Sequence, residues 1–145
     1  MIITGDHGQE LNDNHLNFWG HNSNFTDAQI KVPLIIAGPG VTPGMETETT
    51  GHADIAPTLL SRYLGVTNPV SDYSSGSDLL NPQPRPYQLL ASYTDYALVS
   101  NHNILAVSGT NGGYQLLDKQ NHAVPGEPDF NQLQQAMGQM RQFLK

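Results

Sequence analysis

The fold class follows from the first eight residues, which read Met1-Ile2-Ile3-Thr4-Gly5-Asp6-His7-Gly8. Residues 1–4 predict a short buried strand, and the glycines on both sides of the Asp-His pair allow a sharp turn off its end. In α/β sheets, ligands bind at such strand ends. A carboxylate and an imidazole in this place can bind one divalent cation, and the mixed oxygen and nitrogen pair suits Zn²⁺, Mn²⁺, Mg²⁺ or Ca²⁺. The alternative is that Asp6 caps a turn and His7 is an ordinary polar loop residue.

The segment that follows is polar and irregular over residues 9–29, which predicts a loop without secondary structure of its own. Its aromatic residues Phe18, Trp19 and Phe25 are expected to anchor part of the loop. For Trp19 the competing interpretation is a platform for substrate. The apolar run over residues 32–37 then predicts a second buried strand, of the kind covered on both faces by helices.

A helix is predicted over residues 54–65. Asp54 is the expected N-cap and Gly65 the expected C-cap, with Pro57 near the first turn. The apolar face of this helix is expected to consist of Ile55, Leu59, Leu60 and Leu64.

The second half of the chain predicts a loop rich in Ser, Asp and Pro over residues 70–86, followed by short antiparallel strands. These strands are expected at 87–93, 96–100, 104–108 and 113–118, with Asn111-Gly112 as a hairpin signal. A final helix is predicted over 130–144, capped by Asp129, with an apolar stripe of Leu133, Met137, Met140 and Leu144. The predicted fold is therefore α/β: residues 1–80 form part of a core with the metal-ligand loop, and residues 81–145 form a small antiparallel sheet plus a terminal helix.

Size and charge exclude several classes of protein. The chain has 145 residues, of which 37% are hydrophobic and 13% charged, a composition typical of a loop-rich globular protein. The net charge is −7 and the sequence contains no basic cluster, so a nucleic-acid partner is not expected. The apolar run at 32–37 is far shorter than the ~20 residues of a membrane-spanning helix. Cysteine is absent, so no disulfide is expected.

An ordered series of motifs resembles the second half of the sulfatase and phosphoglycerol or phosphoethanolamine transferase families. It comprises Thr4-Gly5-Asp6-His7-Gly8, Trp19-Gly20-His21, Lys31-Val32-Pro33-Leu34-Ile35-Ile36 and His52-Ala53-Asp54-Ile55-Ala56-Pro57-Thr58-Leu59-Leu60. The stretch over residues 68–82 resembles YejM-type proteins more specifically, which are inner-membrane proteins with a sulfatase-like periplasmic domain. The resemblance implies the C-terminal portion of an alkaline-phosphatase/sulfatase-like fold in a periplasmic location.

The resemblance also implies roles for individual residues. Asp6 and His7 would be ligands of the catalytic divalent metal, and His21 would contact the phosphate or sulfate group. His15 is a weaker match to that loop histidine because it lacks the same flanking residues. His52 is open to two interpretations, since it either faces the site or makes a structural hydrogen bond. The remaining polar candidates are expected to be structural or solvated: Asp54 caps a helix, Lys31 is a solvated charge, and His102 and His122 lie on the surface.

The motifs include no nucleophile, since no Gly-x-Ser-x-Gly elbow is present. We expect Met1 to be internal to a longer parent chain whose N-terminal half contributes the nucleophile and the remaining metal ligands. The isolated chain is then expected to bind metal weakly and to hydrolyse nothing. The parent is expected to act on phosphate or sulfate esters or lipid headgroups. The alternatives are a catalytically silent module that binds lipid or lipopolysaccharide and regulates envelope homeostasis, and a structural domain in which the Asp-His pair is only a turn.

Overall fold

The computed structural model describes residues 1–22 and 24–143. The chain divides into two compact units. The first, called here the sheet unit, comprises Met1–Gly40 and Tyr87–Leu133, and the second, the helix unit, comprises Val41–Pro86 and Gln134–Lys145. The predicted division at residue 80 follows the order of motifs along the chain, whereas these units follow spatial contact. The motif-based division stays a prediction.

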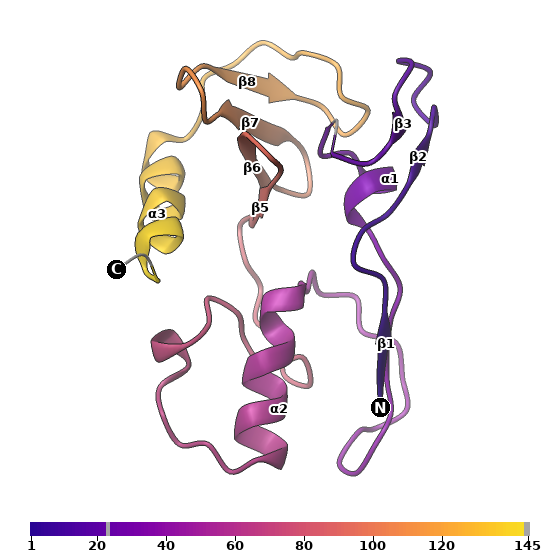
Figure 1. Cartoon of the computed structure of the whole chain (residues 1–145), viewed down its shortest axis with the longest axis vertical. Helices are drawn as coiled ribbons and strands as arrows, with labels where there is room; N and C mark the ends of the chain where they lie inside the picture. Colours follow the sequence, from indigo (N-terminus) through magenta and orange to yellow (C-terminus); the bar gives the residue numbers. More distant parts are fainter. Residues whose placement is uncertain (23, 144–145) are drawn as a thin grey trace. The chain divides into compact units, whose positions relative to one another are not determined.

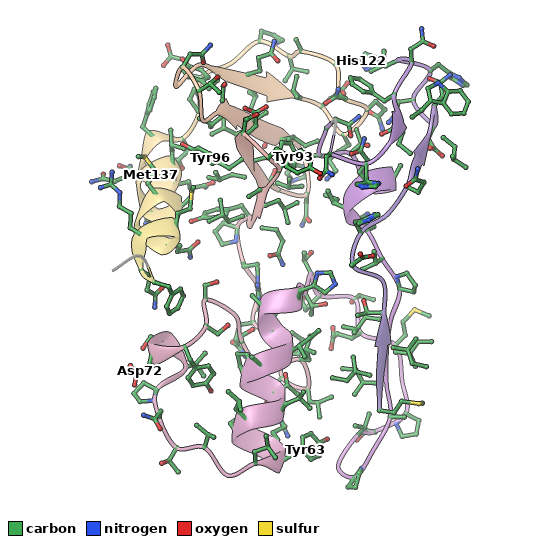
Figure 2. The ribbon with its side chains drawn as sticks, in the orientation of Figure 1. Tyr63, Asp72, Tyr93, Tyr96, His122 and Met137 are labelled. Atoms are coloured by element: carbon green, nitrogen blue, oxygen red, sulfur yellow. The ribbon has the colours of Figure 1, made fainter. Side chains whose placement is uncertain are left out.

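The sheet unit is built on an antiparallel meander of four strands in the order β5-β6-β7-β8. The strands are β5 (Gln88–Ala91), β6 (Asp95–Val99), β7 (Ile104–Ser108) and β8 (Tyr114–Leu117), as Figure 1 shows. All four lie within the predicted segments or one residue from them, and the α/β class with an antiparallel meander is confirmed. Short turns join neighbouring strands, including the one that contains Asn111 and Gly112. Tyr93 lies in the turn between β5 and β6 and is 87% exposed; it is labelled in Figure 2, as is Tyr96 of β6.

The core of the sheet unit lies on one face of this meander. Ala97, Val99, Ile104 and Leu117 of strands β6–β8 pack with Phe25, which comes from the N-terminal segment. Phe25 is 8% exposed and Ile104 fully buried. Burying such side chains stabilises the fold by roughly 1.5–3 kcal/mol each, so this contact holds the N-terminal segment on the sheet.

Strands β1 (Ile2–Thr4) and β4 (Leu34–Ile36) pair in an antiparallel ladder of their own. The strands form as predicted, but the expectation that they are buried is wrong. Ile3 and Ile35 are direct cross-strand partners and are 51% and 54% exposed. A ladder of two strands leaves a face open unless another layer packs on it, and the exposure of this pair shows that the face is not fully covered.

The predicted structureless loop at residues 9–29 instead contains three short elements. Strands β2 (Glu10–Leu11) and β3 (Trp19–Gly20) pair in an antiparallel hairpin, and helix α1 (Asp27–Ile30) follows. Trp19 is 66% exposed, so it does not anchor this segment. The anchors are apolar Phe25 and, as described below, the buried carboxylate of Glu10.

The helix unit contains a 3₁₀ turn, η1 (His52–Asp54), that continues into α2 (Ile55–Tyr63), and a second 3₁₀ turn, η2 (Val70–Asp72). The helix is where the sequence predicts it, but its predicted apolar face is partly wrong. Pro57 and Thr58 are buried, whereas Leu59 and Leu64 are 38% and 70% exposed. A polar contact explains why this side of the helix is buried. The Thr58 hydroxyl accepts a hydrogen bond from the Leu79 amide at 2.7 Å, which holds that side of the helix against residues 74–79.

Asp54 occupies the predicted N-cap position of α2, but its side chain makes no capping hydrogen bond to that helix. Its carboxylate accepts the Gly51 amide at 2.7 Å, the Ser77 amide at 2.6 Å and the Arg85 guanidinium at 2.9 Å. Because Asp54 is also the third residue of η1, the Gly51 contact caps that turn rather than α2. The expected structural role for Asp54 is confirmed, in a wider network than a cap.

The terminal helix α3 spans Phe130–Arg141. Its predicted cap is confirmed, because Asp129 Oδ1 accepts the amides of Asn131 at 2.9 Å and Gln132 at 3.2 Å. Met137 and Met140 of the predicted stripe are 38% and 41% exposed (Met137 is labelled in Figure 2), and Ala136 is buried instead. Leu144 lies outside the described residues. No helix among the described residues has the length and apolar character needed to cross a bilayer.

Candidate active and metal-binding site

The Asp6-His7 pair lies in a tight turn directly after β1. The turn is held by the Gly8 amide, which donates to the Gln29 carbonyl at 2.8 Å. A Cβ atom at Gly8 would lie 2.2 Å from the Ala28 carbonyl oxygen, so only glycine permits this close approach. The backbone of α1 therefore fixes the direction in which the chain leaves the strand, and with it the placement of Asp6 and His7.

The two side chains face each other. The His7 amide donates to Asp6 Oδ1 at 3.0 Å, and Asp6 Oδ2 lies 3.7 Å from His7 Nε2. Two ligand atoms bound to one tetrahedral zinc ion at about 2.0–2.2 Å are about 3.4 Å apart. The observed separation is close to that value, so both groups can reach one cation after a small side-chain adjustment.

The second nitrogen of His7 is already engaged. His7 Nδ1 lies 2.8 Å from the Gly8 carbonyl oxygen, an arrangement that places the proton on Nδ1 and leaves the Nε2 lone pair available. Metal-binding histidines commonly donate their other ring N–H to a backbone carbonyl or carboxylate in this way. The donor chemistry therefore fits a borderline or hard divalent ion at Asp6 Oδ2 and His7 Nε2.

The β2–β3 hairpin brings His21 to this pair. The rings of His7 and His21 stack with their centroids 4.0 Å apart and their planes inclined by 25°. His21 Nδ1 lies 3.3 Å from Gln9 Oε1, which orients the ring and leaves Nε2 for an external partner. The structure thus brings together all three residues that the sequence analysis selected.

The charge environment of Asp6 favours its ionised form. Hydrogen bonds from the backbone amides of Asp6 and His7 lower the pKa of the Asp6 carboxyl, and the nearby His7 and His21 rings lower it further. Its side chain is 90% exposed, so the carboxylate is open to an incoming ion.

Glu10 is the residue that the sequence analysis missed. Its side chain is 1% exposed, and its carboxylate accepts hydrogen bonds from Asn14 (3.1 Å), Asn24 (3.0 Å), Thr26 (2.8 Å) and Gln29 (3.1 Å). These donors are neutral and come from both ends of the His21 segment, so Glu10 closes that segment into a fixed loop. The only signal for this role in the sequence was the presence of several Asn, Thr and Gln residues near one Glu. Such residues are too common in loops to single out Glu10.

The other candidate residues do not join this group. His15 has a positive φ of 58° and its amide bonds to Asn12 within its own turn. Lys31 is 71% exposed and pairs with Asp27 at 2.6 Å, the solvated charge that was expected. His122, labelled in Figure 2, follows β8; its side chain is 55% exposed and pairs with Asp118 at 3.2 Å. His102 is also exposed. His52 lies in the helix unit, so its role stays a prediction.

Comparison with known proteins supports the family resemblance. The sulfatase family model matches residues 1–66. The inner membrane protein YejM of Salmonella typhimurium is 26% identical over 145 residues, which is 99% of this chain and 24% of YejM. These matches support a fragment similar to the alkaline-phosphatase/sulfatase superfamily and to YejM. It spans about a quarter of the length of the YejM relatives.

Two further proteins match. The choline-sulfatase of Rhizobium meliloti is 39% identical over 59 residues, which is 41% of this chain and 11% of that protein. The solved phosphonate monoester hydrolase of Silicibacter pomeroyi superposes with a TM-score of 0.67 at 23% identity, over 97% of this chain and 34% of that one. The latter likeness shows the fold alone. The roles of Asp6 and His7 as metal ligands, and of His21 as an anion-contacting residue, stay predictions.

Proposed function

We propose that the protein containing this chain is a metal-dependent hydrolase or headgroup transferase that acts on phosphate or sulfate esters. The observation that carries the proposal is the placement of Asp6 Oδ2 3.7 Å from His7 Nε2, with the His21 ring stacked on His7. The match to a relative named as a choline-sulfatase supports this reaction class.

In this proposal each of the three side chains has a separate task. Asp6 and His7 bind the divalent cation, which is Ca²⁺, Mg²⁺, Mn²⁺ or Zn²⁺. When bound, a cation of this kind stabilises negative charge on the ester oxygens. Gln9 Oε1 accepts from His21 Nδ1 and holds the ring in orientation, and His21 in its doubly protonated form donates from Nε2 to a nonbridging or leaving oxygen.

The described residues supply only part of such a site. Metal sites in proteins generally have at least three protein ligands, and no group of three or more His, Cys, Asp or Glu in residues 1–22 and 24–143 is arranged to hold a metal ion. We therefore assign the remaining ligands and the nucleophile to the N-terminal half of the parent domain. By analogy with YejM, named as an inner membrane protein, we place this chain in the periplasm as part of a membrane-anchored parent.

The test uses the full-length protein. Mn²⁺ binding and turnover of p-nitrophenyl phosphate and p-nitrophenyl sulfate are measured for the wild type, Asp6→Asn, His7→Ala and His15→Ala. Loss of a ligand is expected to weaken metal binding at least about tenfold and to abolish turnover, while the His15 control retains both. Unchanged Mn²⁺ affinity in Asp6→Asn and His7→Ala would sink the assignment of the metal site.

A second function has one observation in its favour. The alignment with YejM runs along 99% of the chain, whereas the alignment with choline-sulfatase covers 41%. A catalytically silent module that binds a lipid headgroup or lipopolysaccharide fits that pattern. Binding of the full-length protein to lipopolysaccharide-containing vesicles, with no turnover of either ester, would favour this function over the enzyme.

A further inference from the structure

The β2–β3 hairpin, seen in Figure 1, has one face turned to the interior and one turned to solvent. Glu10, whose cross-strand partner is Gly20, points to the interior and is 1% exposed. Because side chains alternate along a strand, the neighbouring positions point outward. Leu11 and Trp19 are direct cross-strand partners at these positions and are 64% and 66% exposed. The hairpin therefore presents an apolar pair to solvent.

A polar pair on the same face belongs to the candidate site. Gln9 lies two residues before Leu11 and, like Leu11, is exposed on the outer side of buried Glu10. Gln9 Oε1 lies 3.3 Å from Nδ1 of His21, which is two residues after Trp19 and is also exposed. Successive side chains on one face of a strand are about 7 Å apart. The apolar pair thus lies one row beyond His21, within reach of the organic group of an ester whose charged group is at that ring.

Hydrogen bonds within the hairpin hold the apolar pair in a fixed position. The Asn12 amide donates to the Phe18 carbonyl at 2.9 Å, which closes the hairpin beyond the pair. The Leu11 amide donates to Asp13 Oδ2 at 2.8 Å. Asn12 Oδ1 in turn accepts the Asn17 amide at 2.7 Å. Because the turn is already ordered, little conformational entropy is lost when a ligand binds to it.

Size and charge limit what can bind to this face. A tryptophan buries about 150–250 Å², so Trp19 and Leu11 together offer far less than the roughly 800 Å² that each partner contributes to a stable protein interface. Residues 9–22 include no Lys or Arg, and the net charge of the chain is −7, which disfavours an anionic membrane surface. The apolar part of a small molecule fits both observations.

We propose that Leu11 and Trp19 bind the organic group of the substrate, and that the substrate is a phosphate or sulfate ester whose organic group is apolar. This inference rests on the proposed function, because it needs the charged end of the ester at Asp6, His7 and His21. Trp19 then sets specificity by contacting the part of the ester that does not react. An ester with a strongly hydrated organic group would have to desolvate polar atoms against the indole without gaining hydrogen bonds.

The test compares long and short alkyl esters on the full-length protein in the presence of Mn²⁺. Calorimetry gives the Kd of octyl and methyl phosphate and of octyl and methyl sulfate, with the octyl esters below their critical micelle concentrations. The proteins are the wild type, Trp19→Ala, Trp19→Phe, Leu11→Ala and the control Tyr93→Ala. Tyr93 is a matched control because it is an exposed aromatic residue in a turn of the same unit.

In the wild type, at least one octyl ester is expected to bind about tenfold or more tightly than its methyl counterpart, because methylene groups are removed from water. Trp19→Ala should bring this ratio close to one, and Leu11→Ala should lower it severalfold. Trp19→Phe should retain most of the ratio, and Tyr93→Ala all of it. The affinity for the methyl ester should be the same in all variants, which shows that the charged site is intact.

Three results would overturn the inference while the proposed function stands. They are equal binding of octyl and methyl esters by the wild type, an octyl preference that persists unchanged in Trp19→Ala and Leu11→Ala, and binding of 1-octanol as tight as that of the octyl esters. The last result would show a surface for apolar chains that is independent of the charged group. Failure of all four esters to bind would overturn the proposed function and this inference together.

Discussion

The imidazole rings of His7 and His21 stack with centroids 4.0 Å apart, although one follows strand β1 and the other ends the β2–β3 hairpin. The local structure around each histidine does not by itself bring the two rings together. The contact exists because the Gly8 amide bonds to the Gln29 carbonyl and because Glu10 gathers donors from both sides of the hairpin. The candidate site is therefore only as rigid as that loop.

Replacing Glu10 by alanine should destabilise the sheet unit. The change removes the carboxylate that accepts four buried or part-buried hydrogen bonds, among them those from Asn24, Thr26 and Gln29. Unsatisfied buried groups cost about 1–3 kcal/mol each, so we expect the free energy of unfolding in urea to fall by about 3 kcal/mol. The exposed Glu48→Ala serves as control and should change it by less than about 0.5 kcal/mol. An unchanged unfolding free energy together with a retained His7–His21 ring NOE in Glu10→Ala would contradict this role.

Stability should fall in acid, and Glu10 should account for part of the loss. Burial raises the pKa of its carboxyl, but the hydrogen bonds from Asn24, Thr26, Gln29 and Asn14 outweigh burial, so the pKa lies below the ordinary 4.5. A depressed folded-state pKa adds stability above the unfolded value, and this stability is lost as pH falls below about 4.5 toward the folded-state pKa. Melting temperatures measured from pH 7 to pH 3 should fall less steeply for Glu10→Gln than for the wild type. Parallel curves for the two proteins would show that Glu10 does not contribute.

Gly8 should tolerate no side chain. A Cβ atom there would lie 2.2 Å from the Ala28 carbonyl oxygen, which is backbone and cannot move aside. We expect Gly8→Ala to cost about 3 kcal/mol or more and to separate the His7 and His21 rings. Gly44→Ala is the matched control, because a Cβ atom at Gly44 has no neighbour within 4 Å. Urea unfolding measures the loss of stability, and the NOE between the His7 and His21 rings reports their separation. A stable Gly8→Ala protein with the NOE intact would refute the close approach.

Asp54 should be the most sensitive acidic residue of the helix unit. It is 1% exposed and pairs with Arg85 at 2.9 Å while accepting the Gly51 and Ser77 amides. Removing one partner of a buried ion pair costs about 3–5 kcal/mol, the loss expected for Asp54→Ala in thermal or urea unfolding. The control is Asp72→Ala in the exposed turn η2, labelled in Figure 2, which should be nearly neutral. Similar losses in the two variants would mean that the Asp54 network does not hold this unit together.

The elements set by local signals were predictable. The β5–β8 meander follows from apolar segments broken by turn residues such as Asn111-Gly112, and the start of α3 follows from Asp129, whose carboxylate caps it as expected. The pair Asp6-His7 was recognisable because glycines flank it at the end of an apolar strand. In each case the decisive interactions lie within a few residues along the chain, where residue type alone specifies the geometry.

The tertiary structure decided the rest. The burial of Glu10, the stacking of His21 on His7, the exposure of Trp19 and the open Ile3–Ile35 pair all depend on which distant segment packs on which face. An isolated sequence carries no measure of such packing: a glutamate in a loop is usually solvated, and an apolar strand is usually covered. Sequence alone determined the chemical groups available to this chain and the short-range turns that present them, whereas long-range contacts determined which of those groups meet.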